Sequence, residues 1–272
     1  MIDYHTHSHV SHDGIGRILE HARRAEEIGL TEICLTEHLD FYISEDGFPC
    51  CTIPTETQLR SYLEEIREVQ GMCRIPVRAG VELDYKPEAD YWIRDMLQRF
   101  SFDFVLGSVH NVGDWPVSGP KELAIDYFQE RGVLQGCLDY FDIVEQAVAT
   151  GLFDSFAHLD LMKRFKPENG KLMRQGVLRD RIAAVLDRMV ATGTGMEVNA
   201  SGIFHPAGEP YPGLQILKLA RDRGVGMLTI GSDSHRPETV GRGLEAALSL
   251  ARAAGYRSLC TFERRQARVV AL

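Results

Sequence analysis

The sequence predicts an α/β protein in which parallel strands form a barrel with helices outside it. Short β-rich runs alternate with longer stretches of helical periodicity along the 272 residues, and this alternation is typical of βα units around a parallel sheet. Histidines and carboxylates follow most of the β-rich runs, where a parallel barrel carries its active site. Single α/β barrels take roughly 200 to 300 residues. Since no linker divides the chain, we expect one domain over residues 1–272.

Seven short runs have the apolar and β-branched composition of strands. Each of the first six is followed by a segment long enough to cross back over the sheet, as parallel pairing requires. In chain order, the predicted strands are Ile2–Tyr4, Glu32–Thr36, Val77–Leu83, Phe104–Ser108, Ser155–His158, Gly195–Asn199 and Met227–Gly231.

Helices are predicted from apolar residues spaced three and four positions apart. The second helix also has a capping box, because Thr55 precedes Gln58 by three residues. After the last helix we expect a final extended segment. The predicted apolar faces are Ile15, Ile18, Leu19, Ala22 and Ile28; Leu59, Tyr62, Leu63, Ile66 and Val69; Ile182, Val185, Leu186 and Met189; and Leu244, Ala247, Leu248 and Ala251.

Three irregular stretches after predicted strands are longer than typical connections, namely Leu39–Pro54, Asn111–Lys121 and Ser201–Pro212. Loops at the carboxyl ends of barrel strands form the active-site face. We therefore expect these stretches to act as lids over a substrate.

The overall charge limits the classes of partner. The chain has 30 Lys and Arg against 39 Asp and Glu, a net charge of -9, which disfavours a protein that holds duplex nucleic acid. No apolar run approaches the ~20 residues that cross a bilayer, and the start MIDYHTHSH lacks the pattern of a signal peptide. We therefore expect a cytoplasmic protein with no nucleic-acid or membrane partner.

The first potential metal ligands lie just after the first strand. His5 and His7 are two residues apart, so on an extended segment their imidazoles project to the same side. Asp13 follows just before a helix, where an N-terminal cap is the alternative interpretation. The later strands add His38 in Thr36-Glu37-His38, Glu82, His110, His158, and the pair Asp233 and His235 in Asp233-Ser234-His235.

The number and kind of these residues indicate a site for several metal ions. A single histidine at a strand end is usually structural, but nine candidates on one face favour metal binding. Nitrogen and carboxylate ligands without sulfur suit Zn²⁺, Mn²⁺ or Fe²⁺. Nine ligands exceed what one ion can use, so we expect two or three ions with a carboxylate such as Glu82 bridging them.

This ordered set resembles the metal signature of the polymerase and histidinol phosphatase (PHP) family. The resemblance implies a distorted (β/α)7 barrel, similar to a TIM barrel, that holds three divalent metal ions. By position it implies three groups of ligands: His5, His7, Glu82 and Asp233 for the first ion; Glu82, His110 and His158 for the second; and Asp13, His38 and His235 for the third.

Segments between the ligands are similar to the histidinol-phosphate phosphatase branch of that family. After Ser201-Gly202 that branch often carries a basic pair, whereas this chain has Phe204-His205. The resemblance implies a phosphomonoesterase that hydrolyses L-histidinol phosphate to L-histidinol and phosphate in histidine biosynthesis. The similar segments are Asp103–His110, Phe156–Leu161 with Arg164-Phe165 after it, Glu197–Gly202 and Gly208–Pro212.

Such an enzyme needs local positive charge, because a phosphate monoester carries up to about two negative charges. We expect a water that bridges two ions, with its pKa lowered toward ~7, to attack phosphorus as hydroxide. Glu82 and Asp233 are then catalytic through the metals. Arg164, His205 and Asp160 are candidates for substrate contact or for the general acid, and Arg164 and His205 are the candidate catalytic groups. The alternatives are a plain surface charge for Arg164 and an ordinary loop histidine for His205. The alternative for Asp160 is to orient a ligand histidine.

Other functions stay open from the sequence alone. A PHP-family phosphatase that acts on nucleotides or other small phosphate esters would carry the same metal ligands. A nuclease or proofreading module attached to a polymerase is disfavoured by the net charge of -9 and by a length of 272 residues. A non-catalytic metal-storage or regulatory protein is disfavoured because all nine ligand positions are filled.

Overall fold

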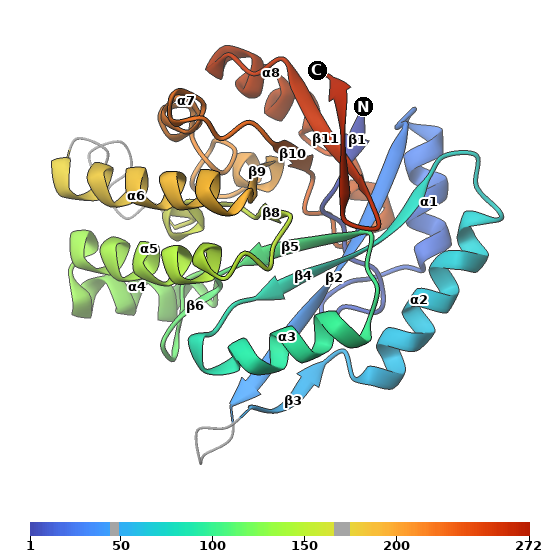
Figure 1. The fold of residues 1–272 in the computed structure, drawn as a ribbon, viewed down its shortest axis with the longest axis horizontal. Helices are drawn as coiled ribbons and strands as arrows, with labels where there is room; N and C mark the ends of the chain where they lie inside the picture. Colours follow the sequence, from blue (N-terminus) through green and yellow to red (C-terminus); the bar gives the residue numbers. More distant parts are fainter. Residues whose placement is uncertain (44–48, 166–174) are drawn as a thin grey trace.

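The predicted parallel barrel is present in the computed structural model, which describes residues 1–43, 49–165 and 175–272 (Figure 1). Its strands pair in parallel in the order β1-β2-β4-β5-β8-β9-β10. Strands that follow one another in the chain are therefore neighbours in the sheet, as in a barrel of successive βα units. They are β1 (Ile2–Asp3), β2 (Glu32–Ile43), β4 (Val77–Asp84), β5 (Phe104–Ser108), β8 (Ser155–Phe156), β9 (Gly195–Asn199) and β10 (Leu228–Gly231).

The first and last strands meet through the segment that follows β1. The Tyr4 N–H donates to Ile230 O at 2.9 Å, and the Asp233 N–H donates to His5 O at 2.8 Å. This seam nearly closes the barrel. It also brings predicted metal ligands from the two ends of the chain into contact.

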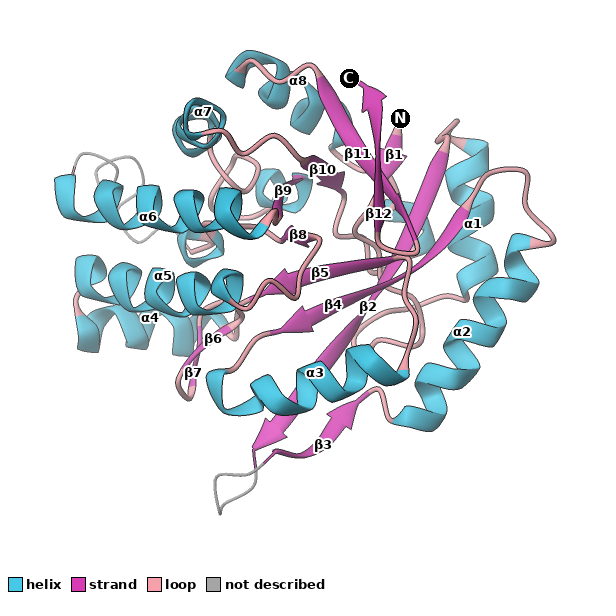
Figure 2. Ribbon diagram, viewed as in Figure 1, coloured by secondary structure: helices cyan, strands magenta, loops and turns pink. Residues whose placement is uncertain are grey.

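Helices surround the sheet, as Figure 2 shows. The predicted capping box is confirmed at the start of α2, where the Thr55 N–H donates to Gln58 Oε1 at 2.9 Å and the Gln58 N–H donates to Thr55 Oγ1 at 3.4 Å. No helix in the described ranges is long and apolar enough to cross a membrane. The α-helices are α1 (Ile18–Glu27), α2 (Glu56–Gln70), α3 (Asp90–Arg99), α4 (Lys121–Arg131), α5 (Val133–Ala149), α6 (Gly176–Thr192), α7 (Leu214–Arg223) and α8 (Leu244–Ala254); short 3-10 helices are η1 (Pro87–Ala89), η2 (Leu161–Lys163), η4 (Ala200–Phe204) and η5 (Pro237–Thr239).

The apolar face predicted for the first helix begins too early. Ile15 is 49% exposed, because α1 begins only at Ile18. Ile15 lies instead in the preceding loop, where its N–H donates to His235 O at 2.8 Å. The faces predicted for α2 and α6 are confirmed as buried, namely Leu59, Tyr62, Leu63, Ile66 and Val69, and Ile182, Val185, Leu186 and Met189.

The predicted end of the second strand at Thr36 is wrong. β2 continues to Ile43, where it has left β4 and pairs antiparallel with β3 (Pro49–Ile53). Leu39 is buried two residues before the equally buried Phe41, which is the alternation of a strand. Much of the stretch Leu39–Pro54 is therefore a hairpin rather than an irregular loop, with residues 44–48 outside the described part of the chain.

The predicted fifth strand is too long at its carboxyl end. β8 ends at Phe156, and His158 has a φ of 26°, which no strand residue adopts. The other two predicted lids contain short regular elements. Asn111–Lys121 includes the hairpin of β6 (Asn111–Val112) and β7 (Trp115–Pro116), and Ser201–Pro212 begins within η4.

The final extended segment is a β-hairpin at the amino end of the barrel. Its strands β11 (Ser258–Glu263) and β12 (Gln266–Ala271) pair antiparallel. Arg265 in its turn contacts the Asp154 carboxylate at 3.0 Å, and the Arg265 N–H donates to Asp103 O at 2.8 Å. Since Asp103 and Asp154 directly precede β5 and β8, the turn ties the hairpin to the end of the barrel opposite the predicted metal ligands.

We expect Asp154→Asn to lower the free energy of unfolding by about 1–3 kcal/mol. The partly buried carboxylate accepts the Val105 N–H at 2.8 Å as well as pairing with Arg265, so an amide leaves the guanidinium without its anion. Urea denaturation of EDTA-treated variant and wild-type protein measures the change. Equal midpoints would contradict the prediction.

Candidate metal centre and active site

The nine predicted metal ligands converge at the carboxyl end of the barrel. They come from β2 and β4, from the segments that follow β1, β5, β8 and β10, and from the loop before α1. Each has a ring nitrogen or carboxylate oxygen within 3.5 Å of another member of the set. The set is His5, His7, Asp13, His38, Glu82, His110, His158, Asp233 and His235.

Glu82 lies at the centre of this set and is 1% exposed. Its two oxygens face different rings, which is the arrangement that a bridging carboxylate requires. Oε2 faces His5 Nε2 at 3.3 Å, His7 Nε2 at 3.5 Å and His38 Nδ1 at 3.0 Å, whereas Oε1 faces His110 Nε2 at 3.4 Å and His158 Nε2 at 3.0 Å.

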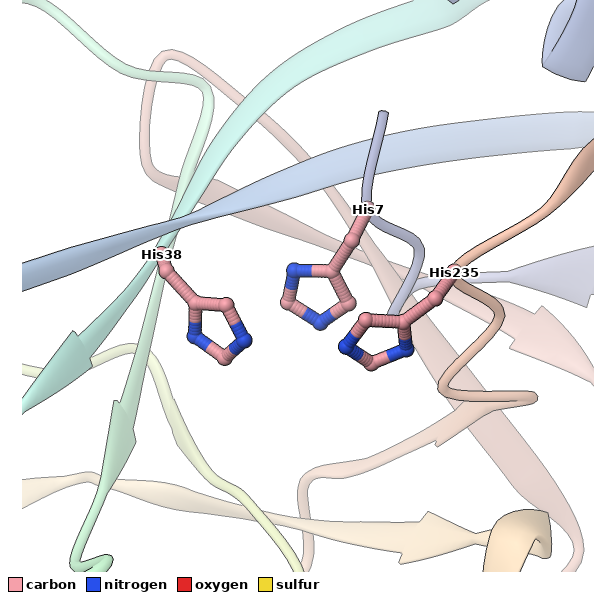
Figure 3. A group of neighbouring side chains, drawn as sticks. All are labelled: His7, His38 and His235. Atoms are coloured by element: carbon pink, nitrogen blue, oxygen red, sulfur yellow. The ribbon is translucent and has the colours of Figure 1, made fainter. Parts of the chain in front are cut away.

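The rings of His7, His38 and His235 lie close together, with His7 between the other two (Figure 3). The His7 ring centroid lies 4.2 Å from that of His38 and 4.3 Å from that of His235. The Asp13 carboxylate contacts His38 Nε2 at 3.6 Å and His235 Nε2 at 3.3 Å. His7, which the resemblance assigns to the first ion, therefore also adjoins the residues assigned to the third.

The imidazoles and carboxylates of the cluster shift one another's pKa values. Burial alone would lower the pKa of His38, but the Glu82 carboxylate raises that pKa to about 9. Nearby carboxylates likewise overcome burial and raise the pKa of His5 and of His110. Burial and the neighbouring imidazoles lower the pKa of His7. Although burial opposes it, the histidines hold the pKa of Glu82 well below its usual range.

The donor set fits divalent metal ions. Three buried ring nitrogens, His5 Nε2, His7 Nε2 and His38 Nδ1, have no hydrogen-bond partner in the described part of the chain. Unpaired buried polar atoms raise the free energy of a fold, and a cation that faces them removes this penalty. Two groups whose donor atoms all lie within 4.8 Å of one another are His5, His7 and Glu82, and Glu82, His110 and His158.

A cavity of about 550 Å³ opens onto the cluster. Its lining includes Glu82, Asp233 and Arg164. Arg164 also lines an adjoining cavity of about 260 Å³, together with Asp233 and His205. The structure therefore brings both predicted basic contacts, Arg164 and His205, to the mouth of the candidate metal centre.

His205 is half-buried beside Tyr211, whose hydroxyl lies 3.4 Å from its Nδ1. Burial, reinforced by the positive charge of Arg164, lowers the pKa of His205 to about 4. The ring is therefore uncharged at neutral pH. It can act as a general acid only after a bound anion has raised this pKa.

Asp160 is buried and does not line either of these two cavities. Its Oδ2 contacts Lys163 Nζ at 2.9 Å and accepts the Gly213 N–H at 3.1 Å. Lys163 Nζ also donates to Pro210 O at 3.0 Å. These bonds fix the loop that carries His205 against η2, and a substrate contact of Asp160 stays a prediction.

Glu37 supports the first ligand segment, a role that the sequence reading missed. It accepts the N–H groups of Ser8 and Ser11 at 3.1 Å and their hydroxyls at 2.6 Å. Ser11 Oγ in turn accepts the His38 N–H at 3.0 Å and lies 3.3 Å from His7 Nδ1. The sequence carries no local signal for this role, because Ser8 and Ser11 lie 29 and 26 residues earlier in the chain.

Asp84 is a second missed residue at the cavity. It lies two positions after Glu82 on β4, so both carboxylates project to the same side of the strand. Its Oδ1 accepts the His110 N–H at 2.8 Å and lies 3.5 Å from His110 Nδ1. The i, i+2 spacing that identified His5 and His7 would also have identified Asp84.

The chain belongs to the PHP domain family, because the sequence model of that family matches residues 3–201. It is 31% identical to a probable histidinol-phosphatase of Deinococcus radiodurans, over 98% of each chain. It is 29% identical to the histidinol-phosphatase of Lactococcus lactis, over 96% of this chain and 94% of that one.

A crystal structure of the histidinol phosphate phosphatase of Lactococcus lactis, in complex with zinc, L-histidinol and phosphate, has the same fold. The TM-score is 0.83 at 26% identity, and the likeness covers 98% of both chains. The predicted PHP-type barrel is therefore confirmed over the whole described chain.

Proposed function

We propose that the chain, as one domain over residues 1–272, is a metal-dependent phosphomonoesterase that hydrolyses L-histidinol phosphate to L-histidinol and phosphate in histidine biosynthesis. The observation that carries this proposal is the convergence of nine residues with nitrogen and oxygen donors, with Glu82 at their centre. Full-length similarity to an enzyme crystallised with zinc, L-histidinol and phosphate supports the choice of substrate.

The donor set supports three divalent ions, with zinc, manganese or iron as the candidates. Glu82 would help to hold two of these ions, because its two oxygens face separate histidines. The proposed groups are His5, His7, Glu82 and Asp233; Glu82, His110 and His158; and Asp13, His38 and His235.

When bound, such ions lower the pKa of a coordinated water toward ~7 and neutralise the charge of phosphate oxygens. The protein contributes the positions of the ions and the contacts at the mouth of the cavity. Arg164 is proposed to hold two phosphate oxygens through its planar guanidinium. His205 is proposed to hold a proton near the leaving alcohol once the phosphate has raised its pKa.

The test of the proposed function is a substrate panel on protein loaded in turn with zinc, manganese and iron. We expect L-histidinol phosphate to give a higher kcat/KM than nucleoside monophosphates or sugar phosphates. The double variant Asp233→Asn, His235→Ala should be inactive on all of them and exclude a contaminating phosphatase. Equal kcat/KM values across the panel would favour a phosphatase for other small phosphate esters.

Arg164→Ala is expected to raise KM for L-histidinol phosphate by roughly 10-fold or more, because one charge-assisted phosphate contact contributes about 1.5–3 kcal/mol. Arg164→Lys should recover only part of this, since an ammonium cannot bind two oxygens in one plane. Steady-state kinetics with each variant at saturating zinc measures both effects. An unchanged KM in Arg164→Ala would remove Arg164 from the substrate site.

A further inference from the structure

Strand β9 lies between β8 and β10 and ends at the carboxyl end of the barrel, where the nine proposed ligands lie (Figure 1). It supplies none of these ligands. The segment Glu197–Gly202, which the sequence singled out, begins on this strand. Glu197 is 1% exposed. A buried carboxylate beside a metal centre needs an explanation, because it is stabilised only by specific partners.

The two carboxylate oxygens of Glu197 hold two different proposed ligands. Oε1 lies 2.7 Å from His5 Nδ1, and Oε2 accepts the His158 N–H at 2.9 Å. Oε2 also accepts Asn199 Nδ2 at 3.1 Å. His5 is assigned to the first ion and His158 to the second, so one side chain contacts a ligand of each.

The contact with His5 fixes the direction of its lone pair. A carboxylate on Nδ1 keeps the ring proton there, which leaves Nε2 free as a metal donor. His5 Nε2 indeed points away from Glu197, toward Glu82 at 3.3 Å and Asp233 at 3.5 Å. The negative charge on Glu197 also makes this nitrogen a stronger donor.

The contact with His158 holds a backbone conformation that would otherwise be unfavourable. A φ of 26° is rare for a residue with a side chain and is energetically unfavourable. The bond from the His158 N–H to Glu197 compensates for part of this and keeps the ring turned toward Glu82.

The absence of a side chain at Gly231 leaves room for Glu197 beside His5. A Cβ added at Gly231 would lie 2.2 Å from His5 Cβ and 2.5 Å from Glu197 Oε1. Only glycine therefore lets His5 and Glu197 approach each other at this point. The rest of the β9 end supports Asp233, whose Oδ2 accepts Ser201 Oγ at 3.1 Å and Asn199 Nδ2 at 3.3 Å.

We propose that Glu197 is a positioning residue that aligns His5 and His158 together, so that the first and second metal positions depend on one buried carboxylate. This inference rests on the proposed ligand groups. It predicts that the loss of Glu197 weakens binding at both positions, although Glu197 itself contacts neither ion.

The test is zinc binding by Glu197→Gln, measured by competition with a chelator of known affinity. A glutamine has a single carbonyl oxygen, so if that oxygen faces His5 Nδ1, its NH₂ group meets the His158 N–H and the Asn199 amide. We expect the affinity of two zinc sites to fall by about 10–100-fold. Glu197→Asp keeps the charge but is too short to reach both partners, and we expect an intermediate loss.

Asp154→Asn is the matched control, because it changes a partly buried carboxylate at the opposite end of the barrel. It should lower the stability of the EDTA-treated protein and leave zinc affinity unchanged, whereas the Glu197 variants should lose affinity even after their own unfolding midpoints are taken into account. If both Glu197 variants bind zinc like the wild type, the inference is overturned and the proposed function stands. If the wild type binds no zinc and hydrolyses no phosphate ester, the proposed function itself fails.

Discussion

Glu82→Gln is expected to lower kcat for L-histidinol phosphate by about 10³-fold or more. A neutral amide has one acceptor oxygen and cannot bridge two cations, so the charge that the ions provide at the phosphate is lost or misplaced. Electrostatic stabilisation by metal ions is worth several kcal/mol, and about 4 kcal/mol corresponds to 10³-fold. Steady-state turnover, together with metal analysis of the dialysed variant, measures the effect.

The matched control for this variant is Glu88→Gln, which changes an exposed glutamate in η1, the connection that follows β4. It should retain the activity and metal content of the wild type. Activity within tenfold of the wild type in Glu82→Gln would show that the chemistry does not depend on a bridging carboxylate. The proposed two-ion role of Glu82 would then be wrong.

The positions of the metal ligands could be predicted because they depend on local pattern and on one property of parallel sheets. The spacing of His5 and His7 indicates that both rings project to the same side. Glu82 and His110 are candidates because they lie at the ends of predicted strands. In a parallel sheet these ends share one edge, so sequence order alone brings the residues together. This is why the nine predicted residues converge at one end of the barrel, where their role as metal ligands stays a prediction.

Glu37 and Glu197 could not be predicted as supporting residues, because their partners are distant in the chain. Glu197 meets His5 only after β9 and β10 have brought the last third of the barrel against its start. A glutamate in a strand looks the same whether it faces solvent or a buried imidazole. The prediction of where β2 ends was wrong for a related reason. Asp40 lies in a strand because β2 pairs with β3, and this pairing was not predicted from the sequence.

Zinc affinity is expected to rise steeply with pH between about 6.5 and 9, while the stability of the EDTA-treated protein falls over the same range. The raised pKa of His38, about 9, means that both ring nitrogens are protonated and the ring is positively charged at neutral pH when no metal is bound. His5 and His110 are shifted in the same direction by neighbouring carboxylates, which outweigh the effect of burial. A metal ion must displace these protons, and each displaced proton contributes up to about tenfold in affinity per pH unit.

The stability of the EDTA-treated protein changes with pH in the opposite direction to the zinc affinity, and this follows from the same pKa values. A ring whose pKa is higher in the folded than in the unfolded chain stabilises the fold fully below its ordinary value of 6.5, and loses that contribution as pH rises through about 9. Urea denaturation with EDTA and chelator competition with zinc, both at pH 6.5, 7.5 and 8.5, give the two slopes. His38→Asn should flatten the stability slope. A stability that stays level or increases from pH 6.5 to 8.5 would mean that Glu82 does not hold protons on these rings, and that the metal ions bind a cluster already free of them.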